Sequence, residues 1–451
     1  MIRYHARWIV PITGAPVASG CVAVDEGRIA FVGSAREAPA GIDDDLGDAI
    51  LLPGLVNAHT HLELTAFRGL LDDLPFREWI ATLQSAKEAV MKPDDFLNAA
   101  RLGVAEGLLA GVTTFADSCD SGVALRAMRE LGARGIMYQE VFGPDPAQSD
   151  RAVADLRAKI DRLRADETPL QRLGVSPHAP YTVSDALFAA AAAYAGEAEL
   201  PMAIHIAESD AEARLVRGAG GPFADALRAR YIAAARRGRS PIEMLQRLGV
   251  LARRPLLIHC VHVDADDVNT IARADCPVAH CPASNAKLGH GIAPVTDMLA
   301  ARIRVGLGSD SMASNDYMDL LAESRLALLA QRVRTRRHDT LSAAAALELA
   351  TLGGARALGL DAEIGSLEPG KSADLVAFEL DDLRATPTYD PSTALVFAHA
   401  PRTVRLSMVA GNVLVRDGRA QLFDSAVQSR VAETARRLAD WKSRKPLDSR
   451  H

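Results

Sequence analysis

The sequence predicts an α/β protein, with a (β/α)8 barrel of the TIM type and a small β-sandwich domain formed by both chain termini. In the middle of the chain, short apolar runs alternate with helical stretches, as in a βα repeat. The two ends instead share alternating apolar and polar residues around turn motifs. The length of 451 residues is enough for a barrel of about 250 residues and a smaller domain.

The N-terminal part of the β-sandwich is expected at residues 1–52. Residues 21–33 alternate apolar and polar positions around Asp25-Glu26-Gly27, a pattern typical of a β-hairpin. Because the far end of the chain repeats this pattern, we expect the two ends to form one domain.

Residues 53–364 are expected to form the barrel. Helical patterns with a 3.6-residue period occupy 95–110, 121–133, 150–165 and 184–197. The longest connection, 208–254, must hold extra helices. The eight predicted strands are 51–57, 111–117, 135–142, 172–177, 201–206, 255–260, 276–280 and 303–309.

The C-terminal part of the chain, residues 365–451, is expected to complete the β-sandwich. A short strand at 373–378 follows a turn at 368–371, and residues 404–419 repeat the hairpin pattern. Residues 426–443 are predicted to form an amphipathic helix that packs outside the domain.

Composition excludes several classes of protein. Hydrophobic residues make up 49% and charged residues 24%, which disfavours a disordered chain. The net charge of -6 and a single short basic run at 332–337 disfavour nucleic acid as a partner. No stretch of 18 apolar residues occurs, so no membrane partner is expected. Five cysteines without a C-x-x-C pair indicate neither disulfides nor a thiolate zinc site. We expect a soluble cytoplasmic protein and a homo-oligomer.

Polar residues collect at the predicted C-terminal ends of the barrel strands, where barrel active sites lie. An H-x-H pair can share a metal, although such a pair alone is also common on polar surfaces. A lone histidine in an apolar run, such as His205, is commonly a core residue, and Asp310 could cap the next helix. Because these positions surround one barrel axis, their coincidence predicts a divalent metal site. The residues at these ends are His59, His61, His178, His205, Glu208, His259, His262, His280 and Asp310.

Six ordered motifs resemble the amidohydrolase superfamily, and more closely its branch of cytosine, S-adenosylhomocysteine and aminodeoxyfutalosine deaminases and triazine chlorohydrolases. They extend over nearly the whole chain. The resemblance implies the same barrel and terminal β-domain. The motifs are PGLVNAHTHLE (53–63), HIAES (205–209), HCVH (259–262), CPASNAKLGHGIAPV (281–295), GLGSDSMASND (306–316) and GSLEPGKSADLV (365–376).

The resemblance implies that four residues bind one divalent metal, which is zinc or iron in that branch. These ligands are His59, His61, His205 and Asp310. Relatives with two metals use a bridging lysine at the end of strand 4, and this strand ends here in Ser176-Pro177-His178. One metal per chain is therefore expected.

The resemblance also implies the catalytic roles. A divalent metal lowers the pKa of bound water from about 15.7 to about 7, so we expect hydrolysis by an activated water. Asp310 and His259 would accept and orient the water proton, and Glu208 would protonate the ring nitrogen next to the attacked carbon. Glu208 could instead only orient a ligand, and His262 competes with His259 for its role.

Four further residues are candidate substrate contacts. His178 matches a histidine that contacts substrate in adenosine-type deaminases. Glu88 matches a ribose-binding glutamate by its spacing from Trp79, although it lies in a helical run where a solvated glutamate is common. Arg68 and Ser176 are candidate donors for the distal end of the substrate.

The segments 57–80, 176–184 and 205–228 most resemble aminodeoxyfutalosine deaminases, which act in menaquinone biosynthesis. The resemblance implies deamination of 6-amino-6-deoxyfutalosine at the adenine C6. The alternatives are an adenosine, methylthioadenosine or S-adenosylhomocysteine deaminase, and then a guanine deaminase or a triazine hydrolase. A catalytically silent barrel is disfavoured because every metal ligand is present.

Overall fold

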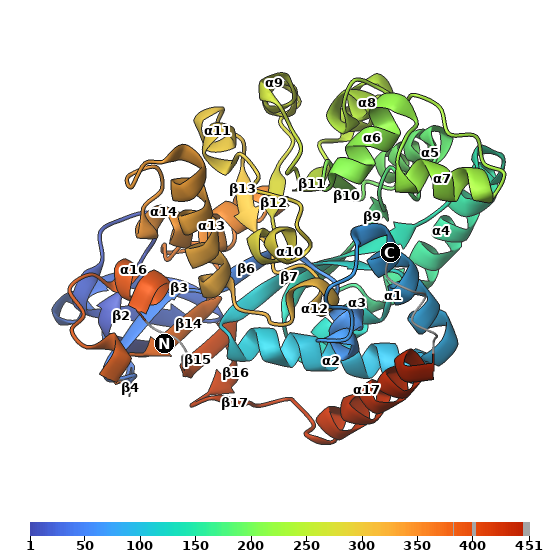
Figure 1. The fold of residues 1–451 in the computed structure, drawn as a ribbon. Helices are drawn as coiled ribbons and strands as arrows, with labels where there is room; N and C mark the ends of the chain where they lie inside the picture. Colours follow the sequence, from blue (N-terminus) through green and yellow to red (C-terminus); the bar gives the residue numbers. More distant parts are fainter. Residues whose placement is uncertain (382, 399–402, 445–451) are drawn as a thin grey trace.

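The computed structural model describes residues 1–381, 383–398 and 403–444 (Figure 1). Eight parallel strands form two sheets, in the orders β6-β7-β8-β9 and β10-β11-β12-β13. Parallel bridges from Val175 to Met202 and from Thr60 to Asp310 close these sheets into one barrel. The barrel strands are β6 (Leu55–Thr60), β7 (Val112–Cys119), β8 (Arg134–Val141), β9 (Gln171–Pro177), β10 (Ala203–Ile206), β11 (Leu256–His259), β12 (Val278–His280) and β13 (Val305–Leu307).

Buried side chains pack together across the barrel strands. Ala58, Ile136, Tyr138, Ile258 and Ala279 belong to one buried cluster that joins strands from both barrel sheets. Such a filled barrel leaves the carboxyl ends of its strands as the place for a site.

Strands from both ends of the chain form one nine-stranded sheet, in the order β17-β16-β15-β14-β5-β1-β2-β3, with β4 paired to β1. Figure 1 shows the blue N-terminal strands beside the orange and red C-terminal strands. Tyr4, Val22, Leu375 and Leu406 share its buried core. The predicted terminal sheet domain and its hairpins are confirmed. The strands are β1 (Ile2–Ile9), β2 (Val17–Asp25), β3 (Arg28–Ser34), β4 (Ile42–Asp45), β5 (Ala49–Pro53), β14 (Leu375–Glu379), β15 (Val404–Val409), β16 (Asn412–Arg416) and β17 (Arg419–Ala420).

The run 51–57, predicted as one barrel strand, is divided between the two sheets, so this part of the prediction was wrong. β5 pairs with β1 and β14, whereas β6 begins at Leu55 and pairs with β7. Both pieces are fully buried, so the apolar run gives no sign of the break. A Cβ atom on Gly54 between them would lie 2.1 Å from Thr113 Oγ1, and only glycine allows this close approach.

At least one helix follows every barrel strand. The four helices predicted from periodicity are confirmed as α2 to α5, and the long connection holds α6, α7 and α8. Between β6 and β13 lie the helices η2 (Leu62–Phe67), α1 (Phe76–Val90), α2 (Pro93–Leu109), α3 (Val123–Glu130), α4 (Ser149–Leu163), α5 (Asp185–Glu197), α6 (Asp210–Gly218), α7 (Pro222–Ala229), α8 (Pro241–Arg247), α9 (Ala265–Arg273), α10 (Pro282–Lys287) and α11 (Val295–Ala300). The helices after β13 are α12 (Met312–Asn315), α13 (Leu320–Thr335), α14 (Ala343–Glu348), η6 (Leu349–Gly353), α15 (Gly354–Leu358) and α16 (Pro391–Thr393).

The predicted C-terminal helix is present as α17 (Ala426–Arg444), which Figure 1 shows in red along α1 and α2. Its Val427, Val431 and Leu438 are buried in one cluster with Phe67 and Trp79. The chain end therefore supports the connection between β6 and β7. Within the described residues, no helix has both the length and the apolar character needed to cross a membrane. The domain boundaries at 52/53 and 364/365 stay a prediction.

Candidate active site

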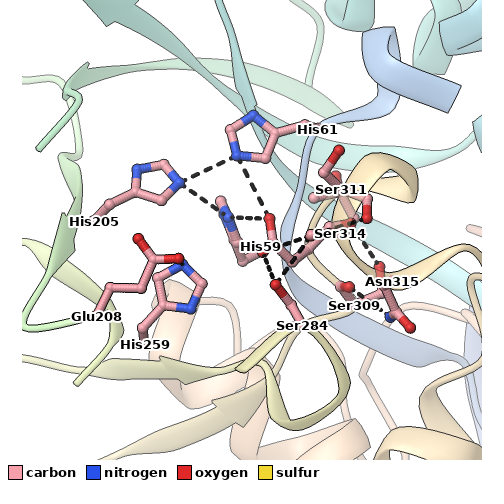
Figure 2. A network of polar contacts seen from close by, with 12 residues as sticks. His59, His61, His205, Glu208, His259, Ser284, Ser309, Ser311, Ser314 and Asn315 are labelled. Carbon is pink, nitrogen blue, oxygen red and sulfur yellow. Dashed lines mark hydrogen bonds and ion pairs between the residues drawn. The ribbon is translucent and has the colours of Figure 1, made fainter. Parts of the chain in front are cut away.

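Four side chains meet at the carboxyl ends of three barrel strands (Figure 2). His59 lies in β6, His61 directly follows it, His205 lies in β10, and Asp310 follows β13. His205 Nε2 lies 3.1 Å from His61 Nε2 and 3.2 Å from His59 Nε2. Asp310 Oδ1 lies 3.2 Å from His59 Nε2 and 3.6 Å from His61 Nε2. Residues far apart in the sequence thus place four potential ligand atoms around one point.

The spacing and the chemistry of these atoms fit a divalent metal ion. Four ligands of a tetrahedral zinc at 2.0 to 2.1 Å lie about 3.3 Å from one another, which is close to the distances observed. His205 Nδ1 lies 3.3 Å from the carbonyl oxygen of His178, and a proton on Nδ1 leaves a lone pair on Nε2. This lone pair points toward the imidazole nitrogens of other histidines, which also need a partner. A cation bound between these nitrogens would provide it.

Burial sets the protonation of this cluster. It lowers the pKa of His61 to about 3, and it also lowers the pKa values of His59 and His205. Burial opposes ionisation of Asp310, but its hydrogen bond with His59 and the nearby imidazoles hold the pKa of this carboxyl well below its usual value. Neutral imidazoles and an ionised carboxylate are the forms that bind metals.

A layer of hydroxyl groups orients Asp310. Its Oδ2 accepts hydrogen bonds from Ser284 Oγ at 2.5 Å and Ser314 Oγ at 3.1 Å, so Oδ1 is left toward the histidines. Asn315 Nδ2 donates to the carbonyl oxygen of Ser309 at 2.7 Å. Asp310 has a φ of 58°, a strained left-handed conformation that these contacts help to hold.

Glu208 and His259 lie beside the metal-ligand cluster, and both are buried. Glu208 Oε1 lies 3.6 Å from His259 Nε2, and its Oε2 accepts from the Tyr181 hydroxyl at 3.4 Å. Asn285 Oδ1 lies 3.0 Å from His259 Nδ1. Burial opposes ionisation of Glu208, but the His259 and His290 imidazoles hold its pKa below the usual value. The predicted catalytic residues are therefore close enough to act on one bound molecule.

A cavity of about 370 Å³ opens onto this cluster. Helix α1 and the residues after β8 and β9 supply much of its wall. His178 and Glu88, both predicted substrate contacts, line it, and Glu88 is exposed and accepts from Gln84 Nε2 at 3.2 Å. His178 Nδ1 lies 2.8 Å from Thr182 Oγ1, and burial lowers the pKa of His178 to about 4.

The other two predicted substrate contacts are not among the residues that line the cavity. Arg68 is exposed and forms an ion pair with Glu106 of α2. Ser176 is fully buried in β9, and its Oγ has no hydrogen-bond partner within the described residues. His262 also lies off the cavity, which favours His259 over its competitor.

Sequence reasoning gave no role to several residues that shape the site. Asn285 and Ser284 hold His259 and Asp310, and both lie inside the 281–295 motif, which was a signal for them. Tyr181, within the segment 176–184, and Lys87, outside every motif and segment named above, both line the cavity. Their positions depend on how α1 and the segment after β9 fold over the barrel, which no local pattern reports.

Comparisons with known proteins agree with this geometry. The family model described as "Amidohydrolase family" matches residues 50–414. A 5-methylthioadenosine/S-adenosylhomocysteine deaminase of Desulforudis audaxviator is 35% identical over 96% of this chain and 98% of the relative. A 5'-deoxyadenosine deaminase of Methanothermobacter thermautotrophicus is 32% identical over 92% of this chain and 94% of the relative.

Two solved structures are similar over nearly the whole chain. A zinc-bound adenosine deaminase from Xanthomonas campestris has a TM-score of 0.85 at 28% identity, over 97% of this chain and 98% of its own. An atrazine chlorohydrolase from Arthrobacter aurescens with zinc has a TM-score of 0.83 at 26% identity, over 97% of this chain and 100% of its own. These likenesses and the histidine-rich cluster indicate a divalent metal site. The chain is a metal-dependent hydrolase of carbon–nitrogen bonds, and it belongs to the amidohydrolase family.

Proposed function

We propose that this protein hydrolyses the amino group from C6 of adenine in 5′-substituted adenosines, with methylthioadenosine, 5′-deoxyadenosine and S-adenosylhomocysteine as the substrate group. The observation that carries the proposal is the placement of Glu208 and His259 beside a four-residue metal-ligand cluster at the end of a cavity. The names of the curated relatives supply the substrate group.

The names of the two curated relatives favour this group over the aminodeoxyfutalosine, with its role in menaquinone biosynthesis, that the sequence predicted. The cavity wall carries charges of both signs, and its Lys87 is paired with Glu63 at 3.3 Å. The lining carboxylates are Glu63, Glu88, Asp120, Glu140, Glu208 and Asp310, and the lining cations are Lys87 and Arg230.

We propose a single zinc ion held by His59, His61, His205 and Asp310. When bound, the metal would act as a Lewis acid that lowers the pKa of a water molecule, so that the water can lose a proton and act as a nucleophile at neutral pH. A single ion is supported by the end of β9, where Ser176 and Pro177 stand and no lysine is present.

The protein groups then handle the protons. Asn285 accepts from Nδ1–H of His259, which leaves the Nε2 lone pair free to take a proton from the attacking water. Asp310 orients that water. Glu208 delivers one proton to the ring nitrogen beside C6, and a second proton leaves with the amine as ammonia.

His178 and Glu88 are the proposed substrate contacts. Thr182 Oγ1 donates to the carbonyl oxygen of Ala179 at 3.1 Å, so it accepts from His178 Nδ1–H. The Nε2 atom of His178 is then an acceptor for a donor group of the nucleoside. Glu88 stands exposed where a ribose hydroxyl could reach it.

A side-by-side kinetic comparison tests the proposal. The zinc-loaded protein is assayed for ammonia release with adenosine, 5′-deoxyadenosine, methylthioadenosine, S-adenosylhomocysteine and aminodeoxyfutalosine. We expect one metal per chain by elemental analysis, and the highest kcat/KM for one of the three proposed substrates. A higher kcat/KM for aminodeoxyfutalosine would return the assignment to that substrate. Absence of turnover on every adenine nucleoside would reject the deaminase proposal.

A further inference from the structure

We propose that His290 is a positioning residue that determines which oxygen of Glu208 delivers the proton to the substrate. The proposal rests on the deaminase function above. His290 lies between α10 and α11 and is 7% exposed. Its Nε2 lies 3.4 Å from Glu208 Oε1 and makes no hydrogen bond with the described residues.

The ring of His290 is held in place from several sides. Its backbone N–H donates to the carbonyl oxygen of Asn285 at 2.8 Å. Phe76 of α1 packs edge-on against its ring, with centroids 4.5 Å apart. The packing of Phe76 therefore supports the present orientation of the imidazole toward Glu208, as expected for a group that orients a neighbour.

The surroundings of Glu208 make its two oxygens different. Oε2 accepts only from the Tyr181 hydroxyl, at 3.4 Å, among the described residues. Oε1 faces His259 Nε2 at 3.6 Å and His290 Nε2 at 3.4 Å. Asn285 accepts the Nδ1 proton of His259, and the proposed mechanism uses Nε2 of His259 as the acceptor of a water proton, so in that step Nε2 does not donate to Oε1. His290 is then the ring that can donate to this oxygen.

We place a hydrogen bond from His290 to Oε1 in the substrate complex, which closes the 3.4 Å gap between them and leaves Oε2 to transfer the proton. In that step the water oxygen bonds to the ring carbon, and the π-electron pair of the ring C=N bond moves to the nitrogen. The Oε2–H bond of Glu208 breaks, and its proton forms an N–H bond with that nitrogen. The proton on Oε2 is one of the two protons of the attacking water, and the other is the proton that His259 takes and that leaves with ammonia, so no further reactant is needed. His290 keeps the carboxylate from turning and offering the wrong oxygen.

The test compares His290→Leu with His290→Gln, whose side-chain amide can keep a donor near the Nε2 position. We expect His290→Leu to lower kcat by about tenfold to a hundredfold, the scale of a hydrogen bond to a charged group, and His290→Gln to stay within about threefold of the native protein. Metal content and the unfolding midpoint check that both variants fold.

A double-mutant cycle separates positioning from general damage. In a Glu208→Gln background, His290→Leu should cause almost no further loss, since it acts through Glu208. An equal loss in both backgrounds, or equal damage by Leu and Gln, would overturn the proposal.

Crystal structures give a readout that needs no turnover. Glu208 should keep its side-chain conformation in His290→Gln and change it in His290→Leu. An unchanged Glu208 conformation in His290→Leu would overturn the positioning role even if the protein deaminates no adenine nucleoside. Failure of the proposed function would appear instead as native protein that holds metal and releases no ammonia.

Discussion

Glu208 is 3% exposed and makes its contacts through both carboxylate oxygens. Replacing it by glutamine keeps the size of the side chain but removes the group that carries the proton. We expect Glu208→Gln to retain the metal and to lower kcat by at least about a hundredfold. Ammonia release and elemental analysis check this. Glu197→Gln, at an exposed glutamate paired with Arg157, is the control and should be unaffected. Near-native turnover of Glu208→Gln with metal bound would contradict the proton-transfer role.

Buried histidines make the stability of the metal-free protein depend on pH. Burial lowers the pKa of His61 and His280 to about 3 and that of His178 to about 4. Below about pH 6.5 the unfolded chain binds protons at these positions while the folded chain does not. The free energy of unfolding therefore falls with decreasing pH, by about 1.4 kcal/mol per pH unit for each histidine. Urea unfolding of the metal-free protein at pH 7, 6 and 5 measures this slope.

His280 offers a clean test of that slope because both of its ring nitrogens lack hydrogen-bond partners within the described residues. His280→Leu should flatten the pH dependence between pH 6.5 and 5. His338→Leu, at an exposed histidine, should leave it unchanged. Equal slopes in the native protein and in His280→Leu would contradict the lowered pKa of His280.

At the scale of single elements, an ion pair between half-buried Lys87 and buried Glu63 joins α1 to the end of the barrel. Lys87 of α1 lies 3.3 Å from Glu63 Oε1, and Glu63 also accepts from the backbone N–H of Ser121 at 3.1 Å. Burial opposes the charge on Lys87, but the carboxylates of Glu63 and Glu140 raise its pKa. Helix α1 contributes much of the cavity wall, so this pair positions the wall.

Lys87→Met would leave the Glu63 carboxylate buried without its cation. We expect the free energy of unfolding to fall by about 3 kcal/mol, the scale for breaking a buried pair. The double variant Lys87→Met with Glu63→Gln should recover part of this loss, because it removes both charges. Denaturant unfolding of the three variants measures the coupling. Additive losses would show that the two side chains do not interact.

At the scale of the whole molecule, one buried ion pair joins the barrel to the terminal sheet. Arg134 begins barrel strand β8, and its Nε and Nη2 donate to Asp374, just before β14, at 2.7 and 3.0 Å. Both residues are buried, and Asp374 also accepts from the backbone N–H of Ala410 at 2.9 Å. The pair therefore connects three segments that are far apart in sequence.

Breaking this pair should destabilise the protein as a whole. We expect Arg134→Met to lower the free energy of unfolding by about 3 to 5 kcal/mol, because Asp374 stays buried without its partner. Urea unfolding followed by tryptophan fluorescence measures the change. Arg337→Met, which removes an exposed ion pair with Asp339, is the control and should leave the midpoint unchanged. An equally small change in both variants would show that the terminal sheet is held by its apolar core alone.

Much of the architecture could be predicted because the signals are local. The βα repeat and the hairpin patterns depend on residues near one another, and they predicted the barrel, the terminal sheet and α17. The division of 51–57 could not be predicted, since β5 and β6 are equally apolar and the break depends on Gly54 passing Thr113. The place of Arg68 could not be predicted either, because its partner Glu106 lies on a separate helix.

By itself the sequence determined the fold class, the family resemblance and the identity of the residues that gather at the barrel end, because strand ends and motifs are read along the chain. Only the tertiary structure decided that the side chains of His59, His61, His205 and Asp310 meet, with neighbouring ligand atoms 3.1 to 3.6 Å apart. Only the tertiary structure also placed His290 Nε2 next to Glu208 Oε1. Contacts between distant residues depend on barrel closure and on backbone conformation at each strand end, and local patterns carry no information about either.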